Sequence, residues 1–292
     1  MFALLLLLQA PDPAPLAVRL AGMTAVTGYE QRMVDSILTL LPGATRDRAG
    51  NAVLRLGAGA PARLIACPLD EPGYVVGGIR DDGRLTLHRV PGRVPPLVDQ
   101  QLEGQRVTVW GARGAVPAVV AVRSVHLTRG RGGAEAPFTA DAAYVDLGAM
   151  NRAQVAAAGV ALLAPVALAK RPHLYGDSLL AAPVAGRRAG CAALVAAAHD
   201  ARPAAGTTVI AFVVEQNLSR RGLLTAMHEY GPFTRTLLVD PDSTAIRDAG
   251  DLGTVARERL AVRYAGTPVE TVPLHEVTAL AGRLRQWIGG GQ

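Results

Sequence analysis

The pattern of apolar residues changes twice along the chain, and this change constrains the fold more than any other feature. Toward both ends, segments with helical spacing of apolar residues alternate with short apolar strands, which is typical of an α/β domain. Between Gly73 and about Ala169, short strands follow one another closely and are separated by turns such as Asp81-Asp82-Gly83, a pattern that favours a small β-barrel. We therefore predict an α/β domain formed by residues 14–72 and 170–292, with residues 73–169 inserted as a β-rich domain.

The apolar periodicity also predicts the individual elements. The expected helices are Leu16–Met23, Tyr29–Leu41, Arg152–Ala158, Arg187–His199, Gly222–Glu229 and His275–Ile288. The expected strands of the α/β domain are Ala52–Leu56, Arg63–Cys67, Thr207–Val214, Thr236–Val239 and Leu260–Tyr264. Those of the insertion are Tyr74–Ile79, Leu85–His88, Arg106–Trp110, Val116–Val122 and Ala143–Leu147.

Composition and charge exclude two classes of protein. Half of the residues are apolar and 18% are charged, which is enough to bury a large core and argues against disorder. The net charge of +6 is carried almost wholly by arginine. The arginines are scattered, and no aromatic residues interleave with them as a base-stacking surface would require. We therefore expect a solvated surface and no nucleic-acid partner.

The chain starts with a short apolar run, Phe2–Leu8, followed by a proline-rich stretch. The run is too short to span a membrane, so we expect no integral membrane association. It resembles the apolar core of a signal peptide, although no basic residue precedes it and Pro11 would follow a cut at Ala10. We predict that residues 1–13 are a leader that exports the protein to the periplasm or the medium; a cytoplasmic protein is the alternative.

The two cysteines, Cys67 and Cys191, cannot form a disulfide framework or a cysteine-based zinc site. Cys191 falls in an alanine-rich helical segment, so we interpret it as a small buried hydrophobic residue. A bridge between the two cysteines is the alternative if the protein is exported.

Five segments, in order along the chain, resemble metallopeptidase family forty-two, the di-zinc aminopeptidases of the glutamyl and tetrahedral type. They are Thr27–Glu30 with Asp47–Asn51, Ala66–Gly73 with Asp81–Gly83, Leu102–Val107 with Val116–Val120, Tyr144–Ala149, and finally Arg188–Ala192 with Phe212–Glu215 and Arg263–Glu270. Their order and spacing carry the match, and together they cover nearly the whole chain. The resemblance implies a three-layer, phosphorylase/hydrolase-like α/β domain with an inserted small β-barrel that serves oligomerisation.

The resemblance also implies a chemistry. The family holds two zinc ions with histidine and carboxylate ligands, one aspartate bridging both metals and a glutamate acting as general base. At the matching positions, the first histidine ligand is Pro68, the bridging aspartate is Gly186 and the last histidine is Gly266. The general base is Gln216 and its neighbouring ligand is Asn217, and these amides neither abstract a proton at neutral pH nor neutralise Zn²⁺.

Two acidic positions of the family are retained. Asp70 matches the aspartate that orients the first histidine, and Asp240 matches a later ligand. Arg187 stands where the family has a second aspartate, so we expect its guanidinium to enter the vacated space and pair with Asp70 or Asp240. Between Asp240 and Leu260 the family carries further elements; we expect a shortened sheet edge here, and a different alignment of Asp240 is the alternative.

We therefore expect no bound metal and no other cofactor, although the family uses zinc. The predicted function is that of a catalytically inactive aminopeptidase-like subunit, which binds a peptide or protein and assembles into a homo- or hetero-oligomer. The alternative is an active metal-dependent aminopeptidase or hydrolase with an altered metal site that includes Asp70 and Asp240. A third hypothesis is a product that folds and has no activity.

Overall fold

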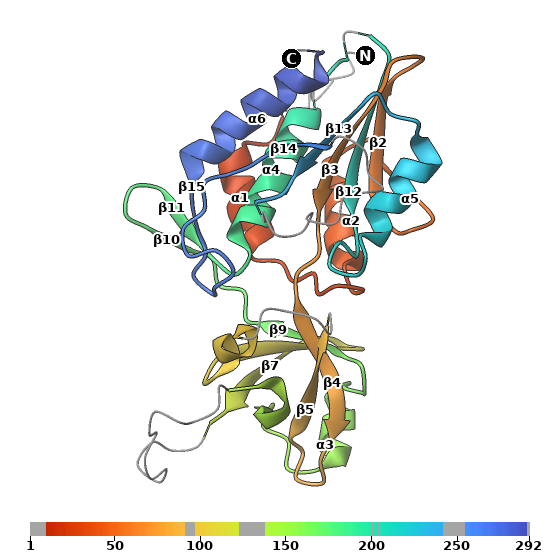
Figure 1. Ribbon diagram of the computed structural model, residues 1–292. Coiled ribbons are helices and arrows are strands. Elements are labelled where there is room, and N and C mark those ends of the chain that lie inside the picture. The colour runs from red at the N-terminus through yellow and green to blue at the C-terminus, as the bar shows by residue number, and fades with distance from the viewer. Residues whose placement is uncertain are drawn as a thin grey trace, which may run out of the picture.

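The structure, a computed structural model, describes residues 10–90, 97–122, 138–199, 201–203, 205–241 and 255–290. Within these residues the chain forms a larger α/β lobe and a smaller β-barrel lobe (Figure 1). Most of the predicted leader, residues 1–9, lies outside the described part. No helix in the described ranges is long and apolar enough to cross a membrane.

The α/β lobe is built on a six-stranded sheet with the order β1-β2-β12-β3-β13-β14. The strands are β1 (Thr45–Arg46), β2 (Ala52–Gly57), β12 (Thr207–Val213), β3 (Ala62–Pro68), β13 (Arg235–Val239) and β14 (Val255–Glu258). The four strands from β12 to β14 are parallel, whereas β1 and β2 pair antiparallel. Every residue of the central strand β12 is buried, because helices cover both faces of the sheet.

Helices form the two outer layers of this lobe. They are α1 (Pro13–Ala21), α2 (Gln31–Leu40), α4 (Ala185–His199), α5 (Arg221–Tyr230) and α6 (Leu274–Ile288). Helices α1, α2, α4 and α6 share one hydrophobic core with one face of the sheet, and α5 packs on the opposite face (Figure 1). Helix α1 begins where Asp12 caps it, since Asp12 Oδ1 accepts from the amide of Ala14 and a proline starts the first turn.

The smaller lobe is a closed barrel with the strand order β4-β5-β8-β7-β6-β9. The strands are β4 (Gly73–Ile79), β5 (Leu85–Val90), β6 (Arg106–Gly111), β7 (Gly114–Ala121), β8 (Tyr144–Asp146) and β9 (Pro165–Leu168), with helix α3 (Arg152–Ala157) and the 3₁₀ turns η1 (Val98–Leu102) and η2 (Ala140–Ala142). Alternating apolar residues of these strands fill the barrel interior. The predicted fold class, a three-layer α/β domain with an inserted small barrel, is confirmed.

A small antiparallel sheet, β10-β11-β15, lies beside helices α4 and α6. In this sheet, the segment that follows the barrel pairs with the segment that precedes α6. Its strands are β10 (His173–Tyr175), β11 (Leu179–Ala181) and β15 (Thr271–Pro273). The apolar periodicity did not indicate these strands, because three-residue strands are too short to show an alternating pattern.

The strand predicted at Leu260–Tyr264 is wrong. The edge strand beside β13 is β14, Val255–Glu258, and Arg263 makes only an isolated bridge to Thr271. Leu260 is buried in the main hydrophobic core although it lies in a loop. The apolar pattern of Leu260–Tyr264 therefore arises from burial and not from pairing in a sheet. Residues 242–254, where family elements were expected to be missing, lie outside the described ranges.

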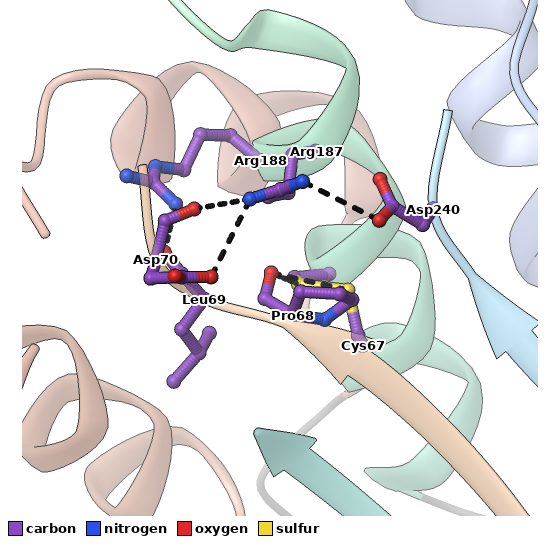
Figure 2. Close-up of a disulfide and its surroundings, with 8 residues drawn as sticks. Cys67, Pro68, Leu69, Asp70, Arg187, Arg188 and Asp240 are labelled. Carbon is purple, nitrogen blue, oxygen red and sulfur yellow. Dashed lines mark hydrogen bonds and ion pairs between the residues drawn. A yellow bond between two sulfur atoms is a disulfide. The ribbon is translucent and has the colours of Figure 1, made fainter. Parts of the chain in front are cut away.

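The interpretation of Cys191 as a simple buried hydrophobic residue is also wrong, because Cys67 and Cys191 form a disulfide (Figure 2). Both cysteines are buried, and the bond joins the end of β3 to the middle of α4. The alanines of α4 allow the helix to lie close to the sheet, and this brings the two Cα atoms to 5.6 Å. Since 124 positions separate the cysteines in sequence, only the packing of α4 on β3 reveals that they meet.

Candidate functional site

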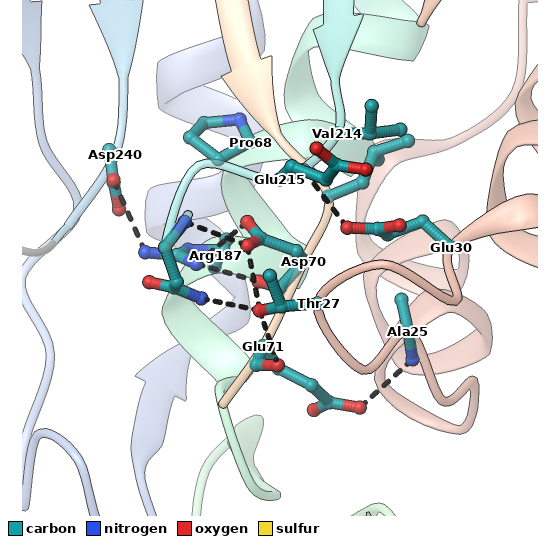
Figure 3. A network of polar contacts seen from close by, with 12 residues as sticks. Ala25, Thr27, Glu30, Pro68, Asp70, Glu71, Arg187, Val214, Glu215 and Asp240 are labelled. Atoms are coloured by element: carbon teal, nitrogen blue, oxygen red, sulfur yellow. Dashed lines mark hydrogen bonds and ion pairs between the residues drawn. The ribbon is translucent and has the colours of Figure 1, made fainter. Parts of the chain in front are cut away.

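The parallel strands β3, β12 and β13 end at one edge of the sheet, and the segments that follow them meet there. Pro68 is the last residue of β3, Asn217 lies shortly after β12, and Asp240 directly follows β13. Helix α4 starts at the same edge, with Gly186 and Arg187 in its first turn. The carboxyl ends of parallel strands form the usual ligand crevice of open α/β sheets, and Figure 3 shows these segments around one cluster of polar side chains.

A cavity of about 410 Å³ lies where this edge faces the barrel lobe. Three of the predicted positions, Asn217, Asp240 and Gly266, line the cavity, and so does Arg187. Its other side is formed by the barrel lobe, which contributes Tyr74 and other residues. Pro68, Gly186 and Gln216 are close in sequence to residues that line the cavity, but they do not line it themselves.

Arg187 lies between the two retained aspartates (Figure 2). Its Nη1 donates to the carbonyl oxygen of Asp70 at 2.6 Å and lies 3.4 Å from Asp70 Oδ1, and its Nη2 lies 3.4 Å from Asp240 Oδ2. All three side chains are almost completely buried. The expected pairing of Arg187 with Asp70 or Asp240 is therefore observed with both carboxylates.

Asp70 is held by further donors on its second oxygen. Asp70 Oδ2 accepts from the Thr27 hydroxyl at 2.9 Å and from the amide of Asn217 at 2.8 Å, and the Asn217 side chain donates to the Thr27 hydroxyl at 3.2 Å. Thr27 reaches this place because the neighbouring residue, Val26, forms a parallel bridge with Glu71. Asp70 is fully buried, and each of its carboxylate oxygens already has a protein partner.

The backbone of the two glycines at predicted ligand positions is bound by a carboxylate. Glu270 Oε1 accepts from the amide of Gly186 at 2.7 Å, and Glu270 Oε2 accepts from the amide of Gly266 at 2.9 Å. A Cβ atom at Gly186 would lie 2.6 Å from Val262 Cγ1 and 2.9 Å from Pro241 Cγ. The space that an aspartate at position 186 needs is thus filled by neighbouring residues, a feature that the sequence did not reveal.

A second buried charge cluster joins this site to the barrel lobe, and sequence reasoning missed it. Lys170 Nζ pairs with Glu71 Oε2, Arg188 Nη2 lies 3.4 Å from the same oxygen, and Glu71 Oε1 accepts from the amide of Ala25 at 2.9 Å. Burial alone would raise the pKa of the Glu71 carboxyl, but the two cations outweigh burial and hold that pKa below its ordinary value. Arg188 also donates to the carbonyl of Leu69, so α4 is bound to the segment that follows β3 by this hydrogen bond and by the pairing with Glu71.

Gln216, the residue predicted to stand at the family's general-base position, is buried. Both polar atoms of the Gln216 side chain are buried and have no partner among the described residues. Within those residues, no group of three or more His, Cys, Asp or Glu side chains is placed to hold a metal ion.

The pKa of the Glu30 carboxyl, which lies near the site, is raised to about 7. Burial is the main cause and the nearby Asp70 adds to it, although the amides of Gly28 and Glu215 donate to Glu30 Oε1 and act in the opposite direction. Since Glu30 is only 2% exposed, its ionisation in the folded protein is costly.

The pH dependence of stability should therefore contain a contribution from Glu30. A raised pKa in the folded state stabilises the protein below the unfolded pKa of about 4.5, and this stabilisation is lost as the pH rises through about 7. Glu30→Gln keeps an oxygen that can accept both amides and does not titrate. Between pH 4.5 and 7.5, denaturant unfolding should show the variant gaining up to about 3 kcal/mol relative to the native chain. Parallel pH profiles of the two proteins would contradict the assignment.

Comparison with known proteins places the chain in a well-defined group. The sequence profile of the M42 glutamyl aminopeptidase family matches residues 50–240. The protein described as "Putative aminopeptidase SgcX" of Escherichia coli K12 is 27% identical over 268 residues, which span 88% of this chain and 69% of that protein.

Solved structures show the same fold at low sequence identity. The aminopeptidase APDkam598 of the archaeon Desulfurococcus kamchatkensis superposes with a TM-score of 0.81 at 15% identity, covering 96% of this chain and 95% of that one. The TET1 peptidase of Pyrococcus horikoshii, described as assembling into a tetrahedron or a large octahedral shell, superposes with a TM-score of 0.80 at 18% identity, covering 95% and 99% of the two chains.

Proposed function

The chain belongs to the M42 glutamyl aminopeptidase family, and from this premise we propose that it keeps the family fold without the family's catalysis and acts by binding. The observation that carries the proposal is the guanidinium of Arg187 between Asp70 and Asp240. An arginine side chain does not lose its proton in proteins, so it is a permanent cation in the place where metal ions would need anionic donors. Asp70 and Asp240 are both already paired with this one cation.

The remaining positions support the same proposal. Zinc sites need several histidine, cysteine or carboxylate ligands, whereas Pro68, Gly186 and Gly266 offer no ligand atom in a side chain. Gln216 and Asn217 are amides and cannot act as a general base at neutral pH. The residues present therefore do not fit a di-zinc centre, and no hydrolytic step can be assigned to them.

A binding role is supported by the cavity and by the inserted barrel. The cavity of about 410 Å³ combines apolar walls with carboxylate and amide groups, as ligand pockets commonly do. The barrel is kept intact, and a relative with the same fold is described as forming large shells. We infer a subunit that binds a peptide or protein in the cleft, or that assembles with copies of itself or with an active relative.

Zinc content and peptidase activity test the loss of catalysis. Protein purified without added metal and dialysed is expected to contain far less than one zinc per chain, because the converging donors are missing. It is also expected to give no turnover of aminoacyl-nitroanilides, with or without added Zn²⁺ or Co²⁺. Metal content is measured by inductively coupled plasma mass spectrometry, with an active M42 enzyme purified in the same way as the control. Stoichiometric, tightly bound zinc would contradict the proposed loss of catalysis.

The alternative, an active hydrolase with an altered metal site, requires Asp70 and Asp240 to release Arg187 and bind a metal ion. The same assay separates it from the binding function. Turnover that a chelator abolishes and added metal restores would favour the alternative and exclude an inactive subunit.

We also propose that the protein matures in an oxidising compartment. The buried Cys67–Cys191 disulfide supports this, because such bonds are uncommon in a reducing cytoplasm. Fractionation of the native cells, followed by thiol labelling in denaturant, would test the location and the bond together.

A further inference from the structure

A second hollow lies at the junction of the two lobes, separate from the cleft. Its volume is about 250 Å³, and its lining comes from the segment before α2, the first turn of α2 and the barrel strands β6 and β9. The lining residues that matter here are Gln31, Arg32 and Trp110. None of the residues that line this hollow lines the larger cavity, so its chemistry is independent of the degenerate metal site.

Arg32 brings an uncompensated positive charge to this hollow. Its guanidinium carbon lies over the Trp110 ring, 4.2 Å from the ring centroid. Stacking uses the face and leaves the N–H groups at the edge available for hydrogen bonds. Among the described residues, Arg32 forms no ion pair and donates no side-chain hydrogen bond. It is also the only charged residue in the described lining of the hollow.

Trp110 adds a second unused donor. The indole Nε1–H is buried and has no acceptor among the described residues. A buried donor without an acceptor is costly, and most buried Trp N–H groups find one. The hollow therefore contains a cation, Arg32, and a neutral donor without an acceptor, the Trp110 Nε1–H. The described lining contains no carboxylate.

We propose that this hollow binds a small carboxylate. A carboxylate is planar, carries one negative charge and accepts in a bidentate way from a guanidinium, and one of its oxygens can accept from the Trp110 Nε1–H. The volume of about 250 Å³ admits a short-chain organic acid and not a folded protein segment. The ligand class is thus a small aliphatic carboxylic acid in its ionised form.

Such a ligand would tie the two lobes together. Arg32 belongs to α2 in the α/β lobe, whereas Trp110 belongs to β6 in the barrel. Tyr29 makes a further contact across the same junction, since its hydroxyl donates to the carbonyl of Leu163 at 2.9 Å. An occupied hollow would hold the barrel against α2, and the barrel forms one wall of the cleft.

Tryptophan fluorescence provides a direct test, because the chain has only two tryptophans. In a Trp287→Phe background, Trp110 is the single reporter, and it is titrated with sodium propionate. Propionamide, which has the same shape without charge, and sodium chloride at equal ionic strength are the controls. We expect a saturable change in Trp110 fluorescence with propionate and none with either control. Equal responses to propionate and propionamide, or no saturable response, would overturn the proposal.

Three variants locate the binding. Arg32→Gln is expected to weaken propionate binding by a factor on the order of ten or more, since it removes a charged hydrogen-bonding partner. Trp110→Phe keeps a ring and loses the N–H, and should weaken binding several-fold when followed by calorimetry. Arg235→Gln is the matched control, because Arg235 stacks on the ring of the other tryptophan, Trp287, and binding should be unchanged. Unaltered affinity in Arg32→Gln, with folding verified by circular dichroism, would reject the site.

Discussion

Replacing Arg187 with methionine is expected to lower the free energy of unfolding by about 3–5 kcal/mol, the usual cost of breaking a buried ion pair from one side. Asp70 and Asp240 would both lose their cationic partner in a nearly solvent-free place, and the carbonyl of Asp70 would lose its donor. Methionine fills a similar volume, so the loss reports charge and hydrogen bonding more than packing. Urea unfolding at neutral pH, followed by far-ultraviolet circular dichroism, measures the change.

A matched control is available on the surface. Arg221 pairs with Glu215 at 2.9 Å, but its side chain is 60% exposed. Arg221→Met should therefore cost no more than about 1 kcal/mol. Arg187→Lys should fall between the two, because one ammonium lacks the fork that reaches two carboxylates. Equal effects of Arg187→Met and Arg221→Met would show that the buried charge bridge does not stabilise the fold.

Removal of the disulfide is expected to have the second large effect. The Cys67→Ser/Cys191→Ser double variant should be less stable by about 2–5 kcal/mol, because the bond closes a long loop and restricts the unfolded chain. The cysteines are 124 positions apart, which places the entropic effect toward the upper part of that range. For a chain of this size, the expected decrease in Tm is roughly 5–15 °C, measured by calorimetry without reductant.

Reductant supplies the control for this variant. The native chain unfolded in excess dithiothreitol should approach the stability of the double variant, which itself should not respond to dithiothreitol. Thiol titration in denaturant should find no free thiol before reduction and both cysteines after it. Identical unfolding midpoints of the native chain with and without reductant would contradict a stabilising role for the bond.

Much of the fold could be predicted because local patterns determine it. The apolar spacing of His275–Ile288 and the continuous apolar run of Thr207–Val214 correspond closely to α6 and β12. The same reasoning was wrong at Leu260–Tyr264, where an apolar stretch is buried as a loop. Burial produces apolar residues whether or not a strand forms, so short runs do not distinguish the two.

The residues of the candidate site could be predicted from the sequence, but only part of their contacts could. The sequence indicates Asp70, Arg187 and Asp240, and the structure brings them into contact. The role of Glu270 could not be seen, since its partners are backbone amides and leave no trace in residue type. The pairing of Lys170 with Glu71 was missed because the two residues lie on opposite sides of the inserted barrel in the chain.

By itself, the sequence determined the fold class, the family and the identity of the residues at the candidate site, because these depend on periodicity and on residue type at ordered positions. Only the tertiary structure decided how the site is filled. Arg187 contacts Asp70 and Asp240 across 117 and 53 positions, and Cys67 meets Cys191 across 124. Contacts at such separations are created when α4 packs on the sheet, and the angle and distance of that packing arise from the whole core and not from any local segment.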